Sequence, residues 1–267
     1  MTVEKFQVGD LPNDLLEQAA RAIEHYATAF IFGEHVASGT FVRINGRPGI
    51  LTARHVWLAV QRFARAGGDV LLVVARGPHR FVLDVSTVTP RVNLDSEEDK
   101  WGPDIEFLEM PPALVSMISA RKSFAELTPK YREVAVSDFG FGVVGGFPQE
   151  YLETEPEGHG DILRRIRGGF TTSIERVFKR GNYDYVETEA DYVHAVGLPS
   201  SFGGASGAGL WRVVLSKIAG APTASATIKD FALLGVEFYE WSDRKERMVL
   251  RAHGPETLYD LLPQLVK

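Results

Sequence analysis

The hydrophobic positions follow a helical repeat only near the two ends of the chain. Asn13 is suited to cap a helix, and apolar residues follow it at the spacing of one buried helical face: Leu16, Ala19, Ala20 and Ile23. Near the other end, Pro255 suits a first helical position, and the same stripe is formed by Leu258, Leu261, Leu262 and Leu265. The sequence therefore predicts one helix at each end.

Between these helices the pattern is typical of short β-strands. From Thr28 to Met248, runs of Val, Ile, Phe, Tyr and Thr are broken by Gly, Pro, Asn and Asp at close intervals. Residues 40–44 and 50–53 flank Asn45-Gly46, a strong signal for a hairpin turn. Further strands are predicted over residues 70–74, 80–85, 133–142, 183–188 and 233–239.

Three segments depart from this β pattern. Residues 56–66 have a helical apolar face, directly after His55, and Gly67-Gly68 ends it. Residues 151–169 are polar and contain glycine, which predicts a long surface loop. Residues 110–128 have a less distinct pattern, and any division of the chain into two halves would fall there.

Composition narrows the class of protein. The chain has 267 residues, 45% of them hydrophobic and 24% charged, which fits one large globular domain or two small ones. It contains no cysteine, so disulfides, thiolate metal sites and thiol nucleophiles are excluded. With a formal net charge of −6 and no basic arm, we expect no nucleic-acid partner. The absence of a secretory signal and of a long apolar run predicts a cytoplasmic protein without membrane contact.

Three polar residues stand in settings that suit catalysis. His55 ends a buried-looking strand at a strand-to-helix corner, Asp104 enters a strand after a polar loop, and Ser206 lies in a run of small residues. Acyl transfer requires an imidazole to take the proton of the serine and a carboxylate to hold that imidazole. The N–H groups of Gly204 and Ser206 are expected to stabilise the oxyanion.

The segments around these residues resemble the trypsin-like serine peptidases, in particular their bacterial, disulfide-free members. The resemblance comprises Thr52-Ala53-Arg54-His55-Val56, Asp104-Ile105 and Gly204-Ala205-Ser206-Gly207, and it covers about residues 29–251. The stretches 37–41, 143–148 and 233–236 also match it.

The resemblance implies an all-β fold of two six-stranded antiparallel β-barrels with N- and C-terminal helices. The implied division is a helical extension over 1–28, a first barrel over 29–125, a second over 126–254 and a helix over 255–267. His55 and Asp104 would come from the first barrel and Ser206 from the second. The resemblance implies a serine endopeptidase that acts on a protein or peptide substrate without cofactor or metal, and it allows a regulatory partner protein.

The resemblance also implies a substrate pocket. Ser200 and Ser201 would lie at its base, and a strand of Phe238, Tyr239 and Glu240 would form its wall. Glu240 either enters the pocket and favours a basic side chain or faces solvent at the rim. The preferred substrate sequence stays open.

Two features differ from the family pattern. Ala205 replaces the usual acid before the serine, which suggests an enzyme that needs no activating cleavage, and Ala208 replaces a glycine. The alternative function is therefore a catalytically silent or latent module that serves as a binding or sensor scaffold.

Each catalytic candidate also has a purely structural interpretation. Ser206 alone is more readily a residue of a glycine-rich turn, His55 a core histidine and Asp104 a turn cap. Asp84 and Asp95 rank below Asp104 as triad acids. The histidines outside the strand-to-helix corner are His25, His35, His79, His159, His194 and His253, of which His35 is the hardest to dismiss.

Overall fold

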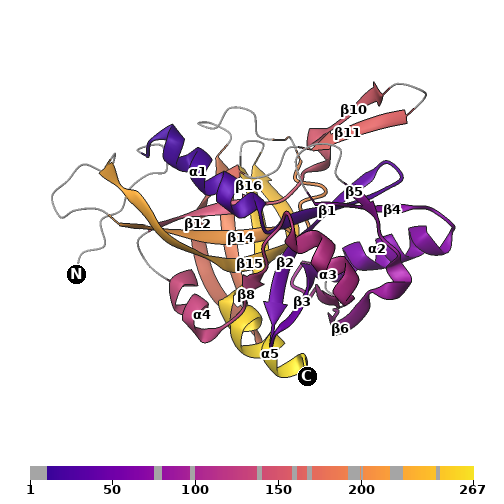
Figure 1. Cartoon of the computed structure of the whole chain (residues 1–267). Coiled ribbons are helices and arrows are strands. Elements are labelled where there is room, and N and C mark those ends of the chain that lie inside the picture. Colours follow the sequence, from indigo (N-terminus) through magenta and orange to yellow (C-terminus); the bar gives the residue numbers. More distant parts are fainter. Residues whose placement is uncertain are drawn as a thin grey trace.

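The computed structural model describes residues 11–74, 80–96, 100–136, 140–157, 161–166, 170–191, 199, 201–216, 225–244 and 247–267. These residues form two mainly antiparallel β units (Figure 1). The N-terminal sheet, coloured indigo to magenta, carries helices α2 and α3. The C-terminal barrel, coloured mostly orange to yellow, lies beside it. The all-β, two-unit fold predicted from the sequence is confirmed.

The N-terminal unit is one eight-stranded sheet. Its strands are β1 (Ala27–Phe32), β2 (His35–Ile44), β3 (Arg47–Thr52), β4 (Val70–Val73), β5 (Arg80–Val82), β6 (Thr89–Leu94), β7 (Ile105–Glu109) and β8 (Ala125–Glu126). The hydrogen-bonded order is β5-β4-β1-β2-β3-β7-β6, and β8 pairs in parallel with β2. The sequence predicted six strands here. The described part has two more, and within it no ladder joins β5 to β6. Pro90 in β6 has no N–H to donate, which suits an edge strand.

The hairpin that leads to His55 forms as its turn residues predict. β2 and β3 pair from Thr40 opposite Leu51 to Ile44 opposite Arg47. Asn45 and Gly46 both have positive φ, 51° and 78°, as a type I′ turn requires. The local sequence is therefore enough to fix the strand that ends just before the histidine.

Helices cover the N-terminal sheet. α2 (Arg54–Arg65) buries Val56, Trp57 and Val60 in a core formed with β1 to β4, and α3 (Pro112–Ser119) adds Ile118. A short 3₁₀ turn, η2 (Val85–Thr87), precedes β6. The predicted helix over 56–66 is confirmed, except that it begins at Arg54, so His55 lies inside its first turn.

The C-terminal unit is a closed six-stranded barrel. Its strands are β9 (Gly140–Gly145), β12 (Phe170–Arg180), β13 (Tyr183–Asp191), β14 (Gly209–Ser216), β15 (Thr227–Arg244) and β16 (Arg247–His253). They close in the order β12-β13-β16-β15-β14-β9. Because a closed barrel has no edge strands, every strand finds two partners. The predicted second barrel is present with the predicted strand number.

Two local predictions are wrong. Residues 129–135 form helix α4 (Pro129–Ala135) rather than the start of a strand, because Pro129 has the fixed φ of a first helical turn. In the segment predicted as a loop, η3 (Gln149–Tyr151) leads into a hairpin of β10 (Leu152–Glu157) and β11 (Asp161–Ile166). In Figure 1 this hairpin projects from the body of the protein. The polar composition of the segment concealed its strand pairing.

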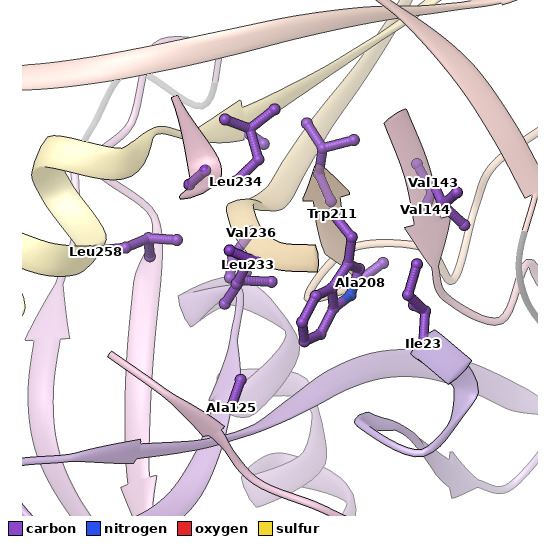
Figure 2. Packing of buried hydrophobic residues seen from close by; sticks show 14 of the residues in the cluster. Ile23, Ala125, Val143, Val144, Ala208, Trp211, Leu233, Leu234, Val236 and Leu258 are labelled. Atoms are coloured by element: carbon purple, nitrogen blue, oxygen red, sulfur yellow. The ribbon is translucent and has the colours of Figure 1, made fainter. Parts of the chain in front are cut away.

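The two end helices seal a core that both units share. α1 (Asn13–Glu24) begins one residue after Pro12, which takes the cap position expected for Asn13. The C-terminal segment is a π-helical turn, η6 (Thr257–Leu261), followed by α5 (Leu262–Leu265). Figure 2 shows Ile23 of α1 near Val143, Val144 and Trp211, with Leu258 on the other side of the cluster. None of the described helices is long and apolar enough to span a bilayer.

Candidate active site

His55 and Asp104 form a pair joined at two points. The His55 backbone N–H donates to Asp104 Oδ1 over 3.0 Å, and His55 Nδ1 lies 2.5 Å from Asp104 Oδ2. The Asp104 side chain is 14% exposed, whereas that of His55 is 53% exposed. The carboxylate therefore fixes one side of the imidazole, and Nε2 on the other side has no hydrogen-bond partner among the described residues.

Local structure explains why these two residues meet. His55 lies in the first turn of α2, where backbone N–H groups have no partner within the helix. The residue just before α2 is Ala53, whose side chain has no acceptor for the N–H groups of the first turn. Asp104, just before β7, supplies the missing acceptor and places a negative charge at the positive end of the helix. The pair thus serves helix capping and imidazole orientation together.

Ser206 lies in a loop made of two consecutive tight turns. Ala205 N–H donates to Phe202 O, and Ala208 N–H donates to Ala205 O, each over 2.7 Å. The third residue of each turn has positive φ: Gly204 at 92° and Gly207 at 91°. Residues other than glycine rarely adopt this backbone conformation, so both positions require glycine.

This loop docks on the N-terminal sheet beside the histidine corner. Ser38 N–H donates to Ser206 O over 3.1 Å, and Ser38 Oγ donates to Gly204 O over 2.7 Å. A Cβ added at Gly207 would overlap Ser38 O and Thr52 Oγ1, so the loop lies close to Thr52, three residues before His55. The fold therefore brings the serine loop to the same edge as His55 and Asp104. No hydrogen bond between Ser206 Oγ and His55 is present among the described residues.

The loop leaves two backbone donors without acceptors. Neither Gly204 N–H nor Ser206 N–H donates a hydrogen bond to any described residue, although their neighbours Gly203, Ala205 and Gly207 all do. Unpaired amide groups two residues apart, next to a serine, are the donors that an oxyanion requires. These are the two groups expected from the sequence.

Gly207 offers a test of how tightly this loop is held. We expect Gly207→Ala to lower the free energy of unfolding by more than about 2 kcal/mol, because the new Cβ combines a strained positive φ with overlap on Ser38 O. Gly181→Ala is the matched control. It has the same sign of φ but open space around it, so about 1 kcal/mol is expected. Urea unfolding of both variants measures the difference, and equal losses would show that Gly207 is not in close contact.

No family model matches the sequence, and no curated protein matches it. Solved structures do match the fold. One comes from work on the coupled folding and binding of the intrinsically disordered Sesbania mosaic virus VPg protein. It has a TM-score of 0.47 and 14% identity, and the match covers 89% of this chain and 90% of its own. Rv3671c from M. tuberculosis H37Rv, in an inactive form, has a TM-score of 0.44 and 13% identity over 90% and 87%.

The HtrA-type protease AlgW with tripeptide has a TM-score of 0.45 and 12% identity, and the match covers 94% of this chain and 63% of AlgW. By themselves, the described strands establish two β units, an eight-stranded sheet and a closed six-stranded barrel. The likenesses are distant and concern the fold alone. The chemistry of this chain is therefore inferred from its own residues.

The described residues of the predicted substrate pocket each make different contacts. Ser201 Oγ donates to Glu240 Oε1 over 3.1 Å, so these two side chains are in contact. Phe238 is buried, and its ring stacks on His253 with centroids 4.4 Å apart. Tyr239 is partly buried, with the Arg251 guanidinium 5.7 Å from its ring centre. Ser200 lies outside the described residues.

The competing acids do not contact His55. Asp84 accepts hydrogen bonds from the backbone and hydroxyl of Ser86, which lower its pKa, and it caps η2. Asp95 accepts from Ser96 N–H. Of the other histidines, His35 is an exposed residue at the start of β2, and His79, His159 and His194 lie outside the described residues.

Sequence reasoning missed two residues of β16 that hold the Asp104 loop. His253 Nε2 accepts the Asp104 N–H over 3.0 Å, and Arg251 Nη1 donates to Lys100 O over 2.5 Å. The Arg251 guanidinium also covers Trp101, 3.9 Å from its ring centre, and pairs with buried Glu187. Positions two apart on a strand share a face. The C-terminal barrel therefore positions the acid that the N-terminal unit supplies.

His253 gives this contact a dependence on pH. Burial lowers the pKa of His253 to about 4, although Asp104 opposes the shift. As pH falls from 6.5, the unfolded chain takes up a proton before the folded chain does. The free energy of unfolding should therefore decrease by about 3 kcal/mol between pH 6.5 and 4 on account of this residue.

His253→Gln keeps an acceptor for Asp104 N–H but does not titrate, so this part of the acid sensitivity should disappear. Urea unfolding of both proteins above and below this pH range measures it. Buried carboxylic acids titrate in the opposite sense but are common to both proteins, so the difference isolates His253. A stability difference that stays constant with pH would contradict the assignment.

Glu106 of β7, two positions after Asp104, is a third residue that sequence reasoning missed. It is fully buried, and Arg54 Nη1 donates to its Oε2 over 2.7 Å. Burial raises the pKa of Glu106 to about 7, although Arg54 opposes the shift. An acid within the otherwise apolar run Ile105-Glu106-Phe107-Leu108 was the available signal.

Proposed function

We propose that this protein is a serine endopeptidase with Ser206 as nucleophile, His55 as general base and Asp104 as the residue that orients His55. The observation that carries the proposal is the two-point contact between His55 and Asp104, which leaves Nε2 free on the other side. An imidazole held in this way has the tautomer needed to accept a proton at Nε2.

The reaction follows from these positions. Ser206 Oγ attacks the scissile carbonyl carbon while its proton passes to His55 Nε2. The oxyanion of the tetrahedral intermediate accepts hydrogen bonds from Gly204 N–H and Ser206 N–H. The C–N bond then breaks as His55 protonates the leaving amine. Water, activated by His55, hydrolyses the acyl-enzyme by the same steps and releases Ser206.

The proposal accounts for a serine that does not hydrogen-bond His55 in the free protein. Such contacts are often long before substrate binds and tighten in the complex. Hydrogen bonds from Ser38 of β2 to Ser206 O and Gly204 O hold the backbone of the loop, so we expect the contact to form by movement of side chains.

The experiment is cleavage of an unstructured protein such as β-casein, with the new N-termini identified by mass spectrometry. Internal cleavage by the wild-type chain, absent with His55→Ala, is the expected result. A folded wild-type protein that cuts nothing would favour the silent scaffold instead, and a His55→Ala variant that cuts equally well would contradict the role of His55 as general base.

A further inference from the structure

We propose that the ion pair of Arg54 with the buried Glu106 positions the catalytic histidine, and that peptidase activity depends on the charge of Glu106. The inference rests on the proposed function and adds regulation by pH to the same site. Both residues act through the contact of His55 with Asp104, so they are positioning residues rather than catalytic ones.

The ion pair joins the two segments that carry His55 and Asp104. Arg54 is the first residue of α2 and directly precedes His55, and Glu106 lies in β7, two residues after Asp104. Arg54 Nη1 donates to Glu106 Oε2 over 2.7 Å. The His55 backbone N–H donates to Asp104 Oδ1 over 3.0 Å. The start of α2 is therefore tied to β7 by the ion pair as well as by the catalytic residues themselves.

The place of Glu106 in the sheet also links it to the strand that leads into α2. Glu106 pairs with Thr52, which ends β3 two residues before Arg54. The Thr52 hydroxyl donates to Ser38 O over 2.8 Å. Ser38 in turn holds the loop of Ser206 through the hydrogen bonds described above. Glu106 thus lies where the segments that hold the histidine and the serine meet.

Stability alone does not explain a charged residue at this position. Glu106 is 0% exposed, and its Oε1 has no hydrogen-bond partner within the described part of the chain. Arg54 Nε also lacks a hydrogen bond there and lies 3.9 Å from Asp95 Oδ2. The desolvation of a buried carboxylate often costs as much as its ion pair returns, and apolar residues of similar volume are often equally stable. The pair therefore points to a role in positioning.

The charge of Glu106 changes near neutral pH. Burial raises the pKa of Glu106 to about 7. Arg54 of α2 opposes this shift, and the charges of Asp95, just after β6, and of Asp104, just before β7, add to it. Above pH 7 the carboxylate holds Arg54 by a charge-assisted hydrogen bond, whereas the neutral acid holds it more weakly. Acidification should therefore lower activity through Glu106 in addition to protonating His55.

The first test is the pH dependence of kcat/KM for a peptide substrate. A general base alone accounts for the uptake of one proton as activity falls, so a second group makes the fall steeper than one proton near pH 7. Glu106→Gln keeps the size of the side chain and an acceptor for Arg54 but cannot ionise. It should lower kcat about 10-fold above pH 7 with little change in KM, and it should reduce the dependence to one proton.

Glu109→Gln is the matched control. Glu109 lies at the other end of β7 and accepts from Arg47 Nη1 over 3.0 Å, so this variant also weakens an ion pair on the same strand. Its kcat and its pH dependence should equal those of the wild type. A Glu106→Gln enzyme with the kcat and pH dependence of the wild type would overturn the proposal.

A double variant separates positioning from support of the fold. Arg54→Met combined with Glu106→Leu replaces the ion pair with apolar side chains, and the protein should unfold at or above the Tm of the wild type. Its kcat should still be at least about 10-fold lower, because His55 has lost the second tie between α2 and β7. Recovery of the wild-type kcat together with the stability would assign the pair to the fold alone and overturn the proposal.

Hydrogen exchange of the His55 backbone N–H tests the positioning without any turnover. This N–H donates to Asp104 Oδ1, so it exchanges faster when the start of α2 is held less firmly. Measured by NMR above pH 7, exchange should be about 10-fold faster in Glu106→Gln than in Glu109→Gln.

The exchange rates also separate this inference from the proposed function. Equal rates in the two variants would overturn the positioning role even if the protein cleaves peptides. Faster exchange in Glu106→Gln, in a protein that neither cleaves peptides nor reacts with a fluorophosphonate, would overturn the peptidase and leave the positioning standing. Faster exchange together with the loss of kcat and of the steep pH dependence supports both.

Discussion

Replacing Ser206 with alanine should lower kcat by about 10⁶-fold, because removal of the nucleophile of such a triad leaves only oxyanion stabilisation and substrate binding. The fold should be unaffected. Ser206 holds the loop through its backbone carbonyl, which accepts from Ser38 N–H, and its Oγ makes no hydrogen bond to a described residue. Single-turnover hydrolysis of a peptide substrate measures the loss.

Ser116→Ala is the matched control for this variant. Ser116 is an exposed serine on α3 whose hydroxyl contacts only Pro112 O among the described residues. Its turnover should equal that of the wild type. If Ser206→Ala retained substantial turnover while unfolding at the same temperature as the wild type, Ser206 would not be the nucleophile.

Asp104→Asn should lower kcat by about 10⁴-fold with little change in substrate binding. The carboxylate uses one oxygen for the His55 backbone N–H and the other for His55 Nδ1. Asparagine has only one acceptor oxygen. If that oxygen stays on the backbone N–H, the amide NH₂ faces Nδ1 and forces the proton onto Nε2. The imidazole then cannot accept the proton of Ser206.

Asp84→Asn is the control for this change. Asp84 caps a 3₁₀ turn through Ser86 and asparagine caps equally well, so neither turnover nor folding should change. A pre-steady-state measurement of the acylation rate compares the two variants. An Asp104→Asn enzyme that acylates as fast as Asp84→Asn would show that Asp104 does not orient His55.

Short-range signals predicted much of this fold and site. The turn between β2 and β3 needs two residues with positive φ, and the dipeptide Asn45-Gly46 predicts such a turn. His55 was recognisable because a polar residue ends an apolar strand where a helix begins. Both depend on neighbours in sequence, which is why the pattern of residues reveals them.

Long-range contacts were not predictable in the same way. Nothing near His253 indicates that it accepts a hydrogen bond from Asp104, 149 residues away. The register of β15 against β16 shifts between Glu237 and Tyr239, a bulge that regular strand alternation does not predict. The extra strands of the N-terminal sheet include β8, only two residues long, which no repeat pattern can signal. In each case tertiary pairing decides the structure.

The most direct test of the central claim is reaction with a fluorophosphonate, which forms a P–O bond with an activated serine as fluoride leaves. Peptide mapping by mass spectrometry locates the adduct. The His55, Asp104 and Ser206 triad predicts a single adduct on Ser206 that is lost in His55→Ala. A folded wild-type protein without an adduct on Ser206, or an adduct that forms equally fast in His55→Ala, would contradict it.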